Sequence, residues 1–343
     1  ATLRTALDAL GHSTLAVEAS HSSRDRTTKL LLAAGDGAAI EMVVMRYRER
    51  VTACISSQVG CPVGCAFCAT GRGGFERNLT VAEIVDQVRV ATALVAEEGR
   101  RLSNLVFMGM GEPLLNLQAV LDSIRVITDP RGLNLGHRAI SVSTVGIPAG
   151  IRRLGRAEPQ VNLALSLHAA DDRIRAQLIP ETYRHPLARI LEAAWDHFEI
   201  THRKLMVEYV LLEGINDSAA DARRLAALLQ GHVVTVNLLA WNPVGPRPRD
   251  VSRRPEANRP EARRQTRETA RDGGGAGSAA AASGETGGPH GGFRPSSPAA
   301  VVAFRDTLLK AGVEAVVRQS KGGGIDAACG QLAGRIRGRR RPQ

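Results

Sequence analysis

The spacing of hydrophobic and polar residues predicts alternating strands and helices over most of the chain. Apolar residues repeat at helical spacing after Thr80, where Glu83 completes a capping-box pattern, so we expect a helix to about Glu98. Short apolar runs predict strands at residues 105–108, 139–143, 161–167, 204–212 and 233–239, with helices at 117–127, after 148, at 187–197 and at 218–229. This alternation predicts an α/β fold with a parallel sheet wrapped by helices. About six such units suit a partial barrel better than an eight-fold one.

Both ends of the chain follow other patterns. Residues 1–25 read as a polar, weakly helical lead-in, because Leu3, Leu7 and Leu10 have helical spacing. Apolar runs at 28–33 and 39–45 flank Gly35-Asp36-Gly37, which predicts a β-hairpin. Near the C-terminus, a helix at 298–311 and a strand at 313–318 resume the alternation.

Five segments follow from these patterns. Residues 1–50 form the lead-in and hairpin, residues 51–244 the core, and residues 293–336 a C-terminal helix, strand and cysteine loop, before a basic tail at 337–343. Residues 245–292 are rich in Arg, Pro, Gly, Ala and Ser, which is the composition of a disordered insert. The insert is either a basic tether that helps to hold a polyanionic partner or a surface loop without a role.

Composition narrows the class of protein. The 343 residues carry 45 Lys and Arg against 34 Asp and Glu, and the net charge of +11 predicts a polyanionic partner. The chain contains no run of eighteen apolar residues, so the sequence predicts no membrane-spanning helix, and it shows no signal-peptide pattern. Five cysteines, most of them in one run, favour a reducing cytoplasm.

Four of the five cysteines lie between Cys54 and Cys68, and three of them form the C-x3-C-x2-C run Cys61, Cys65 and Cys68. Thiolates ligate iron–sulfur clusters, and a closed four-iron cluster takes four of them. Three thiolates leave one iron open to a chelating ligand. A zinc site would show a second cysteine or histidine pair, and a disulfide framework belongs to small secreted domains. The run therefore predicts a [4Fe-4S] cluster with an open iron.

The spacing of these cysteines, with Phe67 before the last one, resembles the signature of radical S-adenosylmethionine (SAM) enzymes. The longer segment Cys54–Cys61 resembles the RlmN/Cfr family of ribosomal RNA adenine methyltransferases, and the similarity extends over about residues 26–332 outside the insert. It implies a partial (β/α)6-type radical SAM barrel with the hairpin as a short N-terminal extension, and two SAM molecules per turnover. The chain departs from the family's pattern in two respects. Its lead-in is shorter than the family's usual N-terminal accessory domain, and it contains the insert.

The resemblance also implies a set of SAM-contacting positions. They share a place at the carboxyl ends of predicted strands, where ligands collect in barrels of this kind. They are Gly111, Glu112, Ser143, Ser166, Leu167, His168 and Asn242. Taken singly each signal is weak, because glycines after a strand often mark a tight turn and a lone histidine is often a packed core residue.

By the same resemblance, the remaining functional residues are Cys329, Cys54 and Glu41. A lone cysteine is commonly a small hydrophobe, but Cys329 follows a glycine-rich approach. The ring carbons C2 and C8 of adenine are poor nucleophiles, so the Cys329 thiolate first takes a methyl group from one SAM. A radical from a second SAM removes hydrogen from this S-methyl group, and the carbon radical adds to the ring. Glu41 removes the ring proton, and Cys54 attacks the carrier sulfur, which leaves a Cys54–Cys329 disulfide for an external reductant.

These inferences predict a cytoplasmic, monomeric RNA methyltransferase that acts on a ring carbon of adenosine, C2 before C8, in 23S ribosomal RNA. Transfer RNA is left open as a second substrate, and a flavodoxin or ferredoxin is the expected electron donor. Two alternatives remain. A radical SAM enzyme with a non-RNA substrate would not need Cys54 and Cys329, and a basic RNA-binding protein with a non-catalytic cluster would bind RNA without cleaving SAM.

Overall fold

The computed structural model describes residues 13–180, 184–244 and 292–334. The chain divides into two units, one of residues 1–245 with 293–343 and one of residues 246–292. The predicted insert at 245–292, apart from Gly292, and the predicted basic tail at 337–343 lie outside the described residues. The described helices and strands all belong to the first unit.

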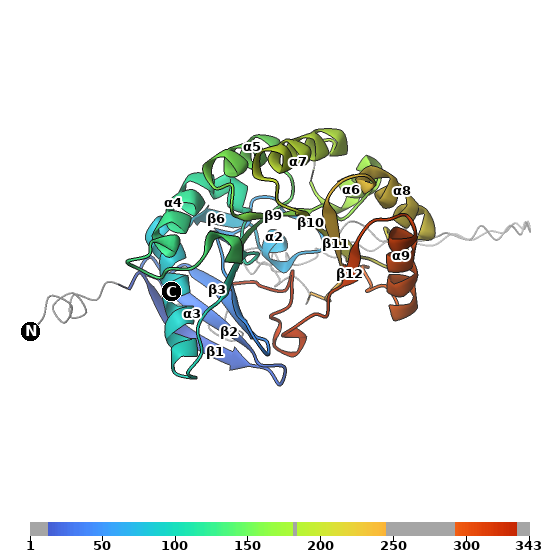
Figure 1. Cartoon of the computed structure of the whole chain (residues 1–343). Coiled ribbons are helices and arrows are strands. Elements are labelled where there is room, and N and C mark those ends of the chain that lie inside the picture. The colour runs from blue at the N-terminus through green and yellow to red at the C-terminus, as the bar shows by residue number, and fades with distance from the viewer. Residues whose placement is uncertain (1–12, 181–183, 245–291, 335–343) are drawn as a thin grey trace, which may run out of the picture. The chain divides into compact units, whose positions relative to one another are not determined.

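A ten-stranded mixed sheet forms the centre of this unit among the described residues (Figure 1). Its antiparallel part is β1 (Leu15–Ser22), β2 (Thr27–Ala34) and β3 (Ala39–Arg46), which pairs with β4 (Val51–Cys54). Six further strands continue parallel to β4 in chain order: β7 (Asn104–Phe107), β8 (Ile140–Thr144), β9 (Asn162–Ser166), β10 (Leu205–Leu211), β11 (Val234–Ala240) and β12 (Ala315–Val317). All seven parallel strands therefore end at one edge.

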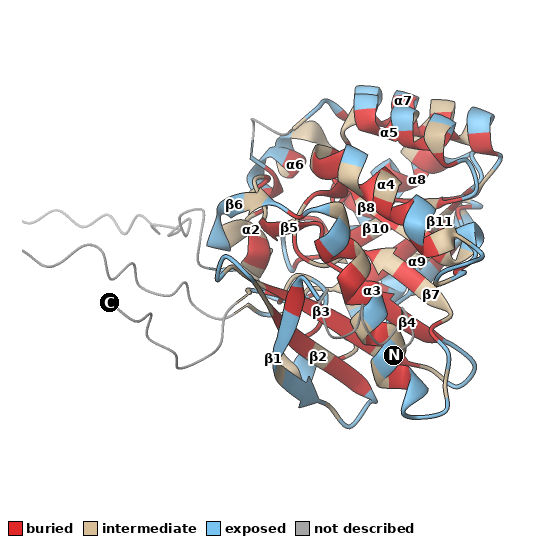
Figure 2. Cartoon of the chain, turned by 90° about the vertical axis from the view of Figure 1, so that its left-hand side faces the viewer, coloured by how far each residue is buried: buried red, intermediate tan, exposed pale blue. Residues whose placement is uncertain are grey.

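Helices connect the parallel strands and lie in an arc along the outer side of the sheet (Figure 1). They are α3 (Val81–Ala96), α4 (Leu117–Thr128), α5 (Pro148–Ala157), α6 (Asp172–Leu178), α7 (Leu187–Thr201), α8 (Ala219–Leu229) and α9 (Pro298–Lys310). Figure 2 shows β3 and β4 mainly buried and β1 mainly exposed, whereas the helices alternate between buried and exposed residues. The predicted α/β architecture, with a parallel sheet and an N-terminal hairpin, is confirmed.

Several short elements escaped the sequence pattern, and most of them lie at the carboxyl edge of the strands. A second, two-stranded sheet pairs β5 (Gln58–Gly60) with β6 (Phe75–Asn78), and α2 (Ala69–Gly73) follows the cysteine run. The 3-10 turns in the described part of the chain are η1 (Pro113–Asn116), η2 (His137–Ala139), which precedes β8, and η4 (Gly323–Ile325). Each is too short for its hydrophobic period to be read from sequence.

The prediction of a weakly helical lead-in over residues 1–25 is wrong for Leu15–Ser22, which form β1. The strand pairs antiparallel with β2, from Leu15 opposite Ala34 to Ser22 opposite Thr28. Only Leu15 is fully buried in β1, so the side chains carry little of the alternation that marks a strand. Backbone hydrogen bonding to β2 determines its conformation, and the Leu15 amide also donates to Asp86 at 2.9 Å.

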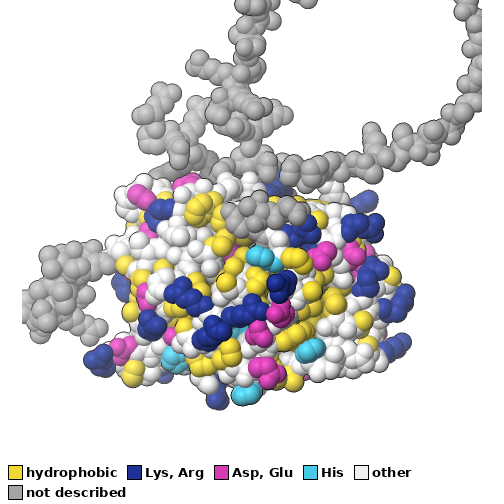
Figure 3. Space-filling model, turned by 90° about the horizontal axis from the view of Figure 1, so that it is seen from above, with side chains coloured by type: hydrophobic (Ala, Val, Ile, Leu, Met, Phe, Trp, Pro, Cys, Tyr) yellow, Lys and Arg dark blue, Asp and Glu magenta, His cyan; other side chains and the backbone are white. Residues whose placement is uncertain are grey.

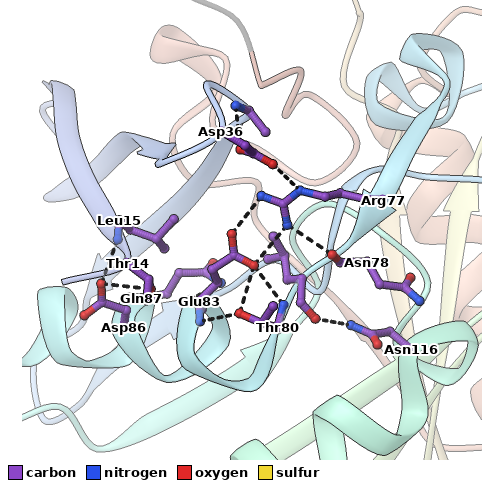
Figure 4. Close-up of polar contacts among 12 residues, drawn as sticks. Thr14, Leu15, Asp36, Arg77, Asn78, Thr80, Glu83, Asp86, Gln87 and Asn116 are labelled. Carbon is purple, nitrogen blue, oxygen red and sulfur yellow. Dashed lines mark hydrogen bonds and ion pairs between the residues drawn. The ribbon is translucent and has the colours of Figure 1, made fainter. Parts of the chain in front are cut away.

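A polar network fastens the hairpin of β2 and β3 to α3 (Figure 4). Arg77 donates to Asp36 in the hairpin turn at 2.7 Å and to Glu83 in the first turn of α3 at 2.8 Å. Burial alone would raise the pKa of the Glu83 carboxyl, but hydrogen bonds from Arg77 and Thr80 outweigh it and lower this pKa. The predicted capping box of Thr80 and Glu83 is confirmed, because each side chain binds the backbone N–H of the other residue.

Among the described residues, no helix combines the length and apolar character needed to cross a bilayer.

The capping box can be tested against a second threonine of the same helix. Replacing Thr80 with Ala removes the acceptor of the Glu83 N–H, and we expect the free energy of unfolding to fall by about 1 kcal/mol. Thr92 bonds only the Val88 carbonyl one turn earlier, so Thr92→Ala should change it by less than about 0.5 kcal/mol. Urea denaturation of both variants measures the difference, and equal losses would show that the cap does not fix the start of α3.

Candidate active site

The segment with Cys61, Cys65 and Cys68 lies between β5 and α2, and several elements hold it. The Cys61 amide donates to Gly74 O at 2.8 Å, and the Ala66 amide donates to Leu178 O at the end of α6 at 3.0 Å. From the end of β11, Trp241 Nε1 donates to Phe67 O at 2.9 Å. The segment is therefore supported independently of any ligand.

The three thiols fit an iron–sulfur cluster. Burial raises the pKa of Cys61 to about 12 and that of Cys65 well above its usual value, and the negative charges of Cys68 and Glu112 raise both further. Thiolates so placed need a nearby cation, and the irons of a cluster supply one. Among the described residues, no three His, Cys, Asp or Glu side chains are grouped closely enough to share one metal ion. Three thiolates on one segment suit a cluster, in which each thiolate binds a different iron.

Gly111 and Glu112 follow β7 at the carboxyl edge of the sheet. Gly111 has φ +104°, and a Cβ there would lie 2.7 Å from Gln58 Cβ, so only glycine allows this close approach. The Glu112 amide donates to Gln58 Oε1 at 2.8 Å. The Glu112 carboxylate accepts from Leu114 N at 3.0 Å and from Val145 N at 2.9 Å, so it joins the end of β7 to the end of β8. Burial raises its pKa to about 7 despite these two hydrogen bonds.

Ser143, Ser166, Leu167 and His168 come together at the ends of β8 and β9. The hydroxyl oxygens of Ser143 and Ser166 lie 3.1 Å apart across the two strands. The Leu167 side chain is buried, so only its backbone is available to a ligand. His168 has φ +59°, its Nδ1 accepts from Val210 N at 3.2 Å, and its ring meets the Phe67 ring edge-on at 4.9 Å. Burial and the charge of Arg175 lower the pKa of His168 to about 3, so it is neutral near pH 7.

Arg175, on α6, is a site residue that the sequence did not reveal. Its guanidinium is fully buried and donates to three backbone carbonyls, those of Val145, Leu167 and His185, which lie on separate segments. Its charge also lies near Cys65, where it partly offsets the factors that raise the thiol pKa. Arg175 therefore holds the ends of β8 and β9 together beside the cysteine run.

We call residues 321–334 the carrier loop, because they contain Cys329. The loop lies against α2 immediately after Cys68, since Ala69 N donates to Gly330 O at 2.7 Å and Thr70 Oγ1 donates to Leu332 O at 2.6 Å. From the end of β11, Asn242 Nδ2 donates to Cys329 O at 3.3 Å. The predicted SAM-contacting residue Asn242 thus touches the predicted methyl carrier.

Cys54 and Cys329 are both free thiols, the first buried at the end of β4 and the second solvent-accessible. Burial raises the pKa of the Cys54 thiol strongly, and the nearby Cys329 raises it further. Although Cys329 is accessible, the protein that surrounds it raises the pKa of its thiol to about 11, and Glu208 adds to this effect. Glu208 itself accepts from Asn237 Nδ2 at 2.8 Å. No sequence pattern indicated these last two residues, because each sits singly in an apolar strand.

Glu41 lies on β3, where Val43 is opposite Cys54, and it reaches the same edge of the sheet as the cysteines. Its side chain is 4% exposed and pairs with Lys29 on β2, with Nζ and Oε1 3.0 Å apart. Its other oxygen, Oε2, accepts from the amides of Ala333 and Gly334 at 2.6 and 3.2 Å. The predicted base is therefore in direct contact with the carrier loop. Lys29 was not predicted, because a single lysine in a strand normally marks only a solvent-facing position.

The structure thus brings all the predicted site residues to the carboxyl edge of one sheet, although their roles stay predictions.

The chain is similar to several known proteins. A family model described as "Radical SAM superfamily" matches residues 55–226. Relatives described as "Probable dual-specificity RNA methyltransferase RlmN" include one from Moorella thermoacetica, 43% identical over 89% of this chain and 75% of the relative. Another, from Symbiobacterium thermophilum, is 40% identical over 92% of this chain and 73% of the relative.

Among solved structures, the chain is similar to one described as a radical SAM methyltransferase from Sphaerobacter thermophilus. The TM-score is 0.81 at 36% identity, and the alignment covers 98% of this chain and 86% of the other.

Iron content tests the assignment of the cysteines. We expect Cys61→Ala, Cys65→Ala and Cys68→Ala each to lose most of the iron bound after anaerobic reconstitution, because each removes one of three ligands. Cys54→Ala and Cys329→Ala serve as matched controls and should bind as much iron as the unaltered protein. Iron analysis and the visible absorption of the cluster measure both sets. Equal iron loss in all five variants would contradict this division.

Asp25 provides a pH test of the contact between the carrier loop and the turn that joins β1 to β2. Its carboxylate accepts from Gly322 N at 2.8 Å. Burial opposes its ionisation, but hydrogen bonds from Ser23, Gly322 and Thr27 outweigh burial and lower its pKa from 3.8 to about 2. A lowered folded-state pKa stabilises the protein above the unfolded-state value, and this contribution is lost as the pH falls through the folded-state value. The melting temperatures of the unaltered protein and Asp25→Asn should therefore differ at pH 5 and converge towards pH 2. A constant difference would contradict the assignment.

Proposed function

Since the chain belongs to the radical SAM superfamily and, within it, to the RlmN family of dual-specificity RNA methyltransferases, we propose that it transfers a methyl group from SAM to a ring carbon of adenosine in RNA. The observation that carries this proposal is the contact of the Cys329 loop with the segment after Cys68, through the hydrogen bond from Ala69 N to Gly330 O at 2.7 Å. A methyl carrier must reach the site at which SAM binds. A radical SAM enzyme that does not use a cysteine carrier would have no need of a thiol held there.

We propose that C2 is the methylated position rather than C8, following the resemblance to the RlmN/Cfr family, in which C2 methylation is the commoner activity. The RlmN relatives are described as dual-specificity enzymes, which leads us to expect two RNA substrates, for which we propose 23S ribosomal RNA and transfer RNA. The net charge of +11 supports a polyanionic substrate. Residues 335–343, which contain five arginines, follow the carrier loop directly in the sequence and would add to the attraction for RNA.

RNA would approach the carboxyl edge of the sheet rather than the outer helices. Figure 3 views the helical side and shows Lys and Arg side chains interspersed with acidic and hydrophobic ones. Arg152 on α5, for example, pairs with Glu192 and Asp196 on α7. Neutralised arginines of this kind offer little to a phosphate backbone.

The parallel strands would form the partial (β/α)6 barrel of the superfamily, with residues 51–244 as its core. A [4Fe-4S] cluster would be held by Cys61, Cys65 and Cys68. Once bound there, the cluster would supply the electron that cleaves SAM reductively. The SAM-contacting positions would be Gly111, Glu112, Ser143, Ser166, Leu167, His168 and Asn242. Glu112 and Leu167 would contact SAM through their backbone atoms. The Glu112 carboxylate already binds two amides, and the Leu167 side chain is buried.

The residues of the chain would then act in sequence. The Cys329 thiol loses its proton and attacks the methyl group of SAM, which forms a thioether and releases S-adenosylhomocysteine. After one hydrogen is removed from this S-methyl group, the resulting carbon radical would add to the adenine ring. The Glu41 carboxylate would take the ring proton, and the adduct would give up its unpaired electron, for which the cluster held by the three cysteines would be the acceptor. The Cys54 thiolate then attacks the Cys329 sulfur. The S–C bond breaks, an S–S bond forms, and the carbon left on adenine takes up a proton to become the methyl group.

The raised pKa values of the Cys54 and Cys329 thiols affect these reaction steps. A thiol with a pKa near 11 is almost entirely protonated at pH 7, so Cys329 reacts only as its thiolate forms. The same protonation keeps two neighbouring thiols from repelling each other at rest.

We further propose that the protein is monomeric, works in the cytoplasm, and receives electrons from a flavodoxin or ferredoxin.

Nucleoside mass spectrometry tests this function. Anaerobically reconstituted protein, SAM and a reductant are incubated with ribosomal or transfer RNA, and the RNA is digested. We expect 2-methyladenosine from the unaltered protein and none from Cys329→Ala. Cys54→Ala should yield protein that is covalently attached to RNA, because the thioether cannot be cleaved. The appearance of 8-methyladenosine would overturn the choice of ring position, and SAM cleavage without either nucleoside would overturn the RNA substrate.

A further inference from the structure

Lys29 and Glu41 form a buried ion pair inside the hairpin. Their side chains are 12% and 4% exposed, and Nζ lies 3.0 Å from Oε1. The pair spans neighbouring strands, since Leu31 on β2 is opposite Glu41 and Lys29 is opposite Val43. Taking two charges out of water is unfavourable unless each is well satisfied, so a pair of this kind needs further partners.

Those further partners belong to the carrier loop. Lys29 Nζ donates to Asp326 O at 3.1 Å, three residues before Cys329. Glu41 Oε2 accepts from the amides of Ala333 and Gly334, four and five residues after Cys329. The ion pair therefore grips the loop on both sides of the carrier cysteine. In Figure 1 the segment after β12 runs across the opening of the sheet towards β3, where this grip occurs.

Close packing at Gly334 shows that the contact is specific. Gly334 has φ +64°, and a Cβ there would lie 2.8 Å from both Ala39 O and Met110 Cε. A side chain at this position would push the loop away from Glu41. The backbone of Glu41 is fixed as well, because Ser56 Oγ donates to its carbonyl at 2.7 Å.

The two sets of contacts on Glu41 differ in one respect. The amides of Ala333 and Gly334 occupy Oε2, the oxygen that is not paired with Lys29, and a proton acceptor needs a free lone pair there. These amides are part of the loop that carries the methyl group, whereas Lys29 lies on the same hairpin as Glu41. Lys29 is therefore the partner of Glu41 that does not belong to the loop.

We propose that Lys29 is a positioning residue, which orients the Glu41 carboxylate towards the ring proton and links it to the carrier loop through Asp326. This inference rests on the proposed function, in which Glu41 is the base. Lys29 touches neither the substrate nor SAM in this proposal, and it acts only through Glu41 and the loop backbone. Without Lys29, the carboxylate loses its fixed orientation at the moment when the loop amides leave.

The test compares Lys29→Met, Lys29→Arg and the control Lys204→Met under single-turnover conditions. Lys204 also pairs with a glutamate, Glu314 at 2.7 Å, but both side chains are about half exposed and lie at the opposite end of the parallel strands. We expect Lys29→Met to slow methyladenosine formation by about 10- to 100-fold, as misplaced catalytic groups do. Lys29→Arg should recover most of this rate, and Lys204→Met should match the unaltered protein.

A comparison of Cys329 methylation with methyladenosine formation in Lys29→Met shows whether Lys29 positions Glu41 or has only a structural role. Methylation of Cys329, followed by intact-protein mass, should change by less than about threefold in Lys29→Met, because that step does not use Glu41. Protein bound covalently to RNA should accumulate, because the ring proton is removed slowly. Equal losses in Cys329 methylation and in methyladenosine, with no bound RNA, would overturn the proposal, as would an unchanged rate of methyladenosine formation.

Hydrogen exchange provides a reading that needs neither SAM nor RNA. The peptide containing Ala333 and Gly334 should exchange at least about tenfold faster in Lys29→Met than in the unaltered protein, and Lys204→Met should show no change. Unchanged exchange in Lys29→Met would overturn the link to the loop. Failure of the unaltered protein to methylate RNA would instead count against the proposed function, and the exchange result would still decide whether Lys29 holds the loop.

Discussion

The return of the chain across the open side of the sheet is the constraint on which the rest of the site depends. Seven parallel strands end at one edge, but β12 does not pair with β1, so the sheet stays open among the described residues. The carrier loop leaves β12 and fastens to Asp25, in the turn before β2, and to Lys29 and Glu41 in the hairpin. This path lays Cys329 beside the cysteine run and near Cys54, which no local sequence preference could achieve.

Each layer of the fold contributes to holding that path. The capped helix α3 and Arg77 fix the hairpin that carries Lys29 and Glu41, and the buried guanidinium of Arg175 joins the strand ends on the other side of the cysteines. Polar groups that are buried in this way must be satisfied by specific partners, so they define a single arrangement more strictly than apolar packing does. The chemistry that we propose needs such precision, because one thiol must meet SAM, adenine and a second thiol in turn.

Much of the fold and part of the site could be predicted from sequence. The helix after Thr80 and the parallel strands follow from spacing and capping, and the cysteine run indicates its cluster directly. The strand at Leu15–Ser22 was missed because its stability comes from pairing with β2 rather than from its own pattern. Lys29 and Arg175 were missed for a related reason: Lys29 meets a residue 297 positions away, and Arg175 bonds three separate segments of backbone. Long-range polar contacts leave no period in the sequence.

The division of the five cysteines into a cluster set and a carrier pair is the central claim, and disulfide mapping after a single turnover tests it most directly. The reaction would be run with a limiting one-electron reductant and no thiol reductant, quenched with acid, and alkylated for peptide mass spectrometry. We expect one Cys54–Cys329 disulfide for each methyladenosine formed, with Cys61, Cys65 and Cys68 recovered as alkylated thiols. Methyladenosine formed without that disulfide, or with one that includes a cluster cysteine, would contradict the claim.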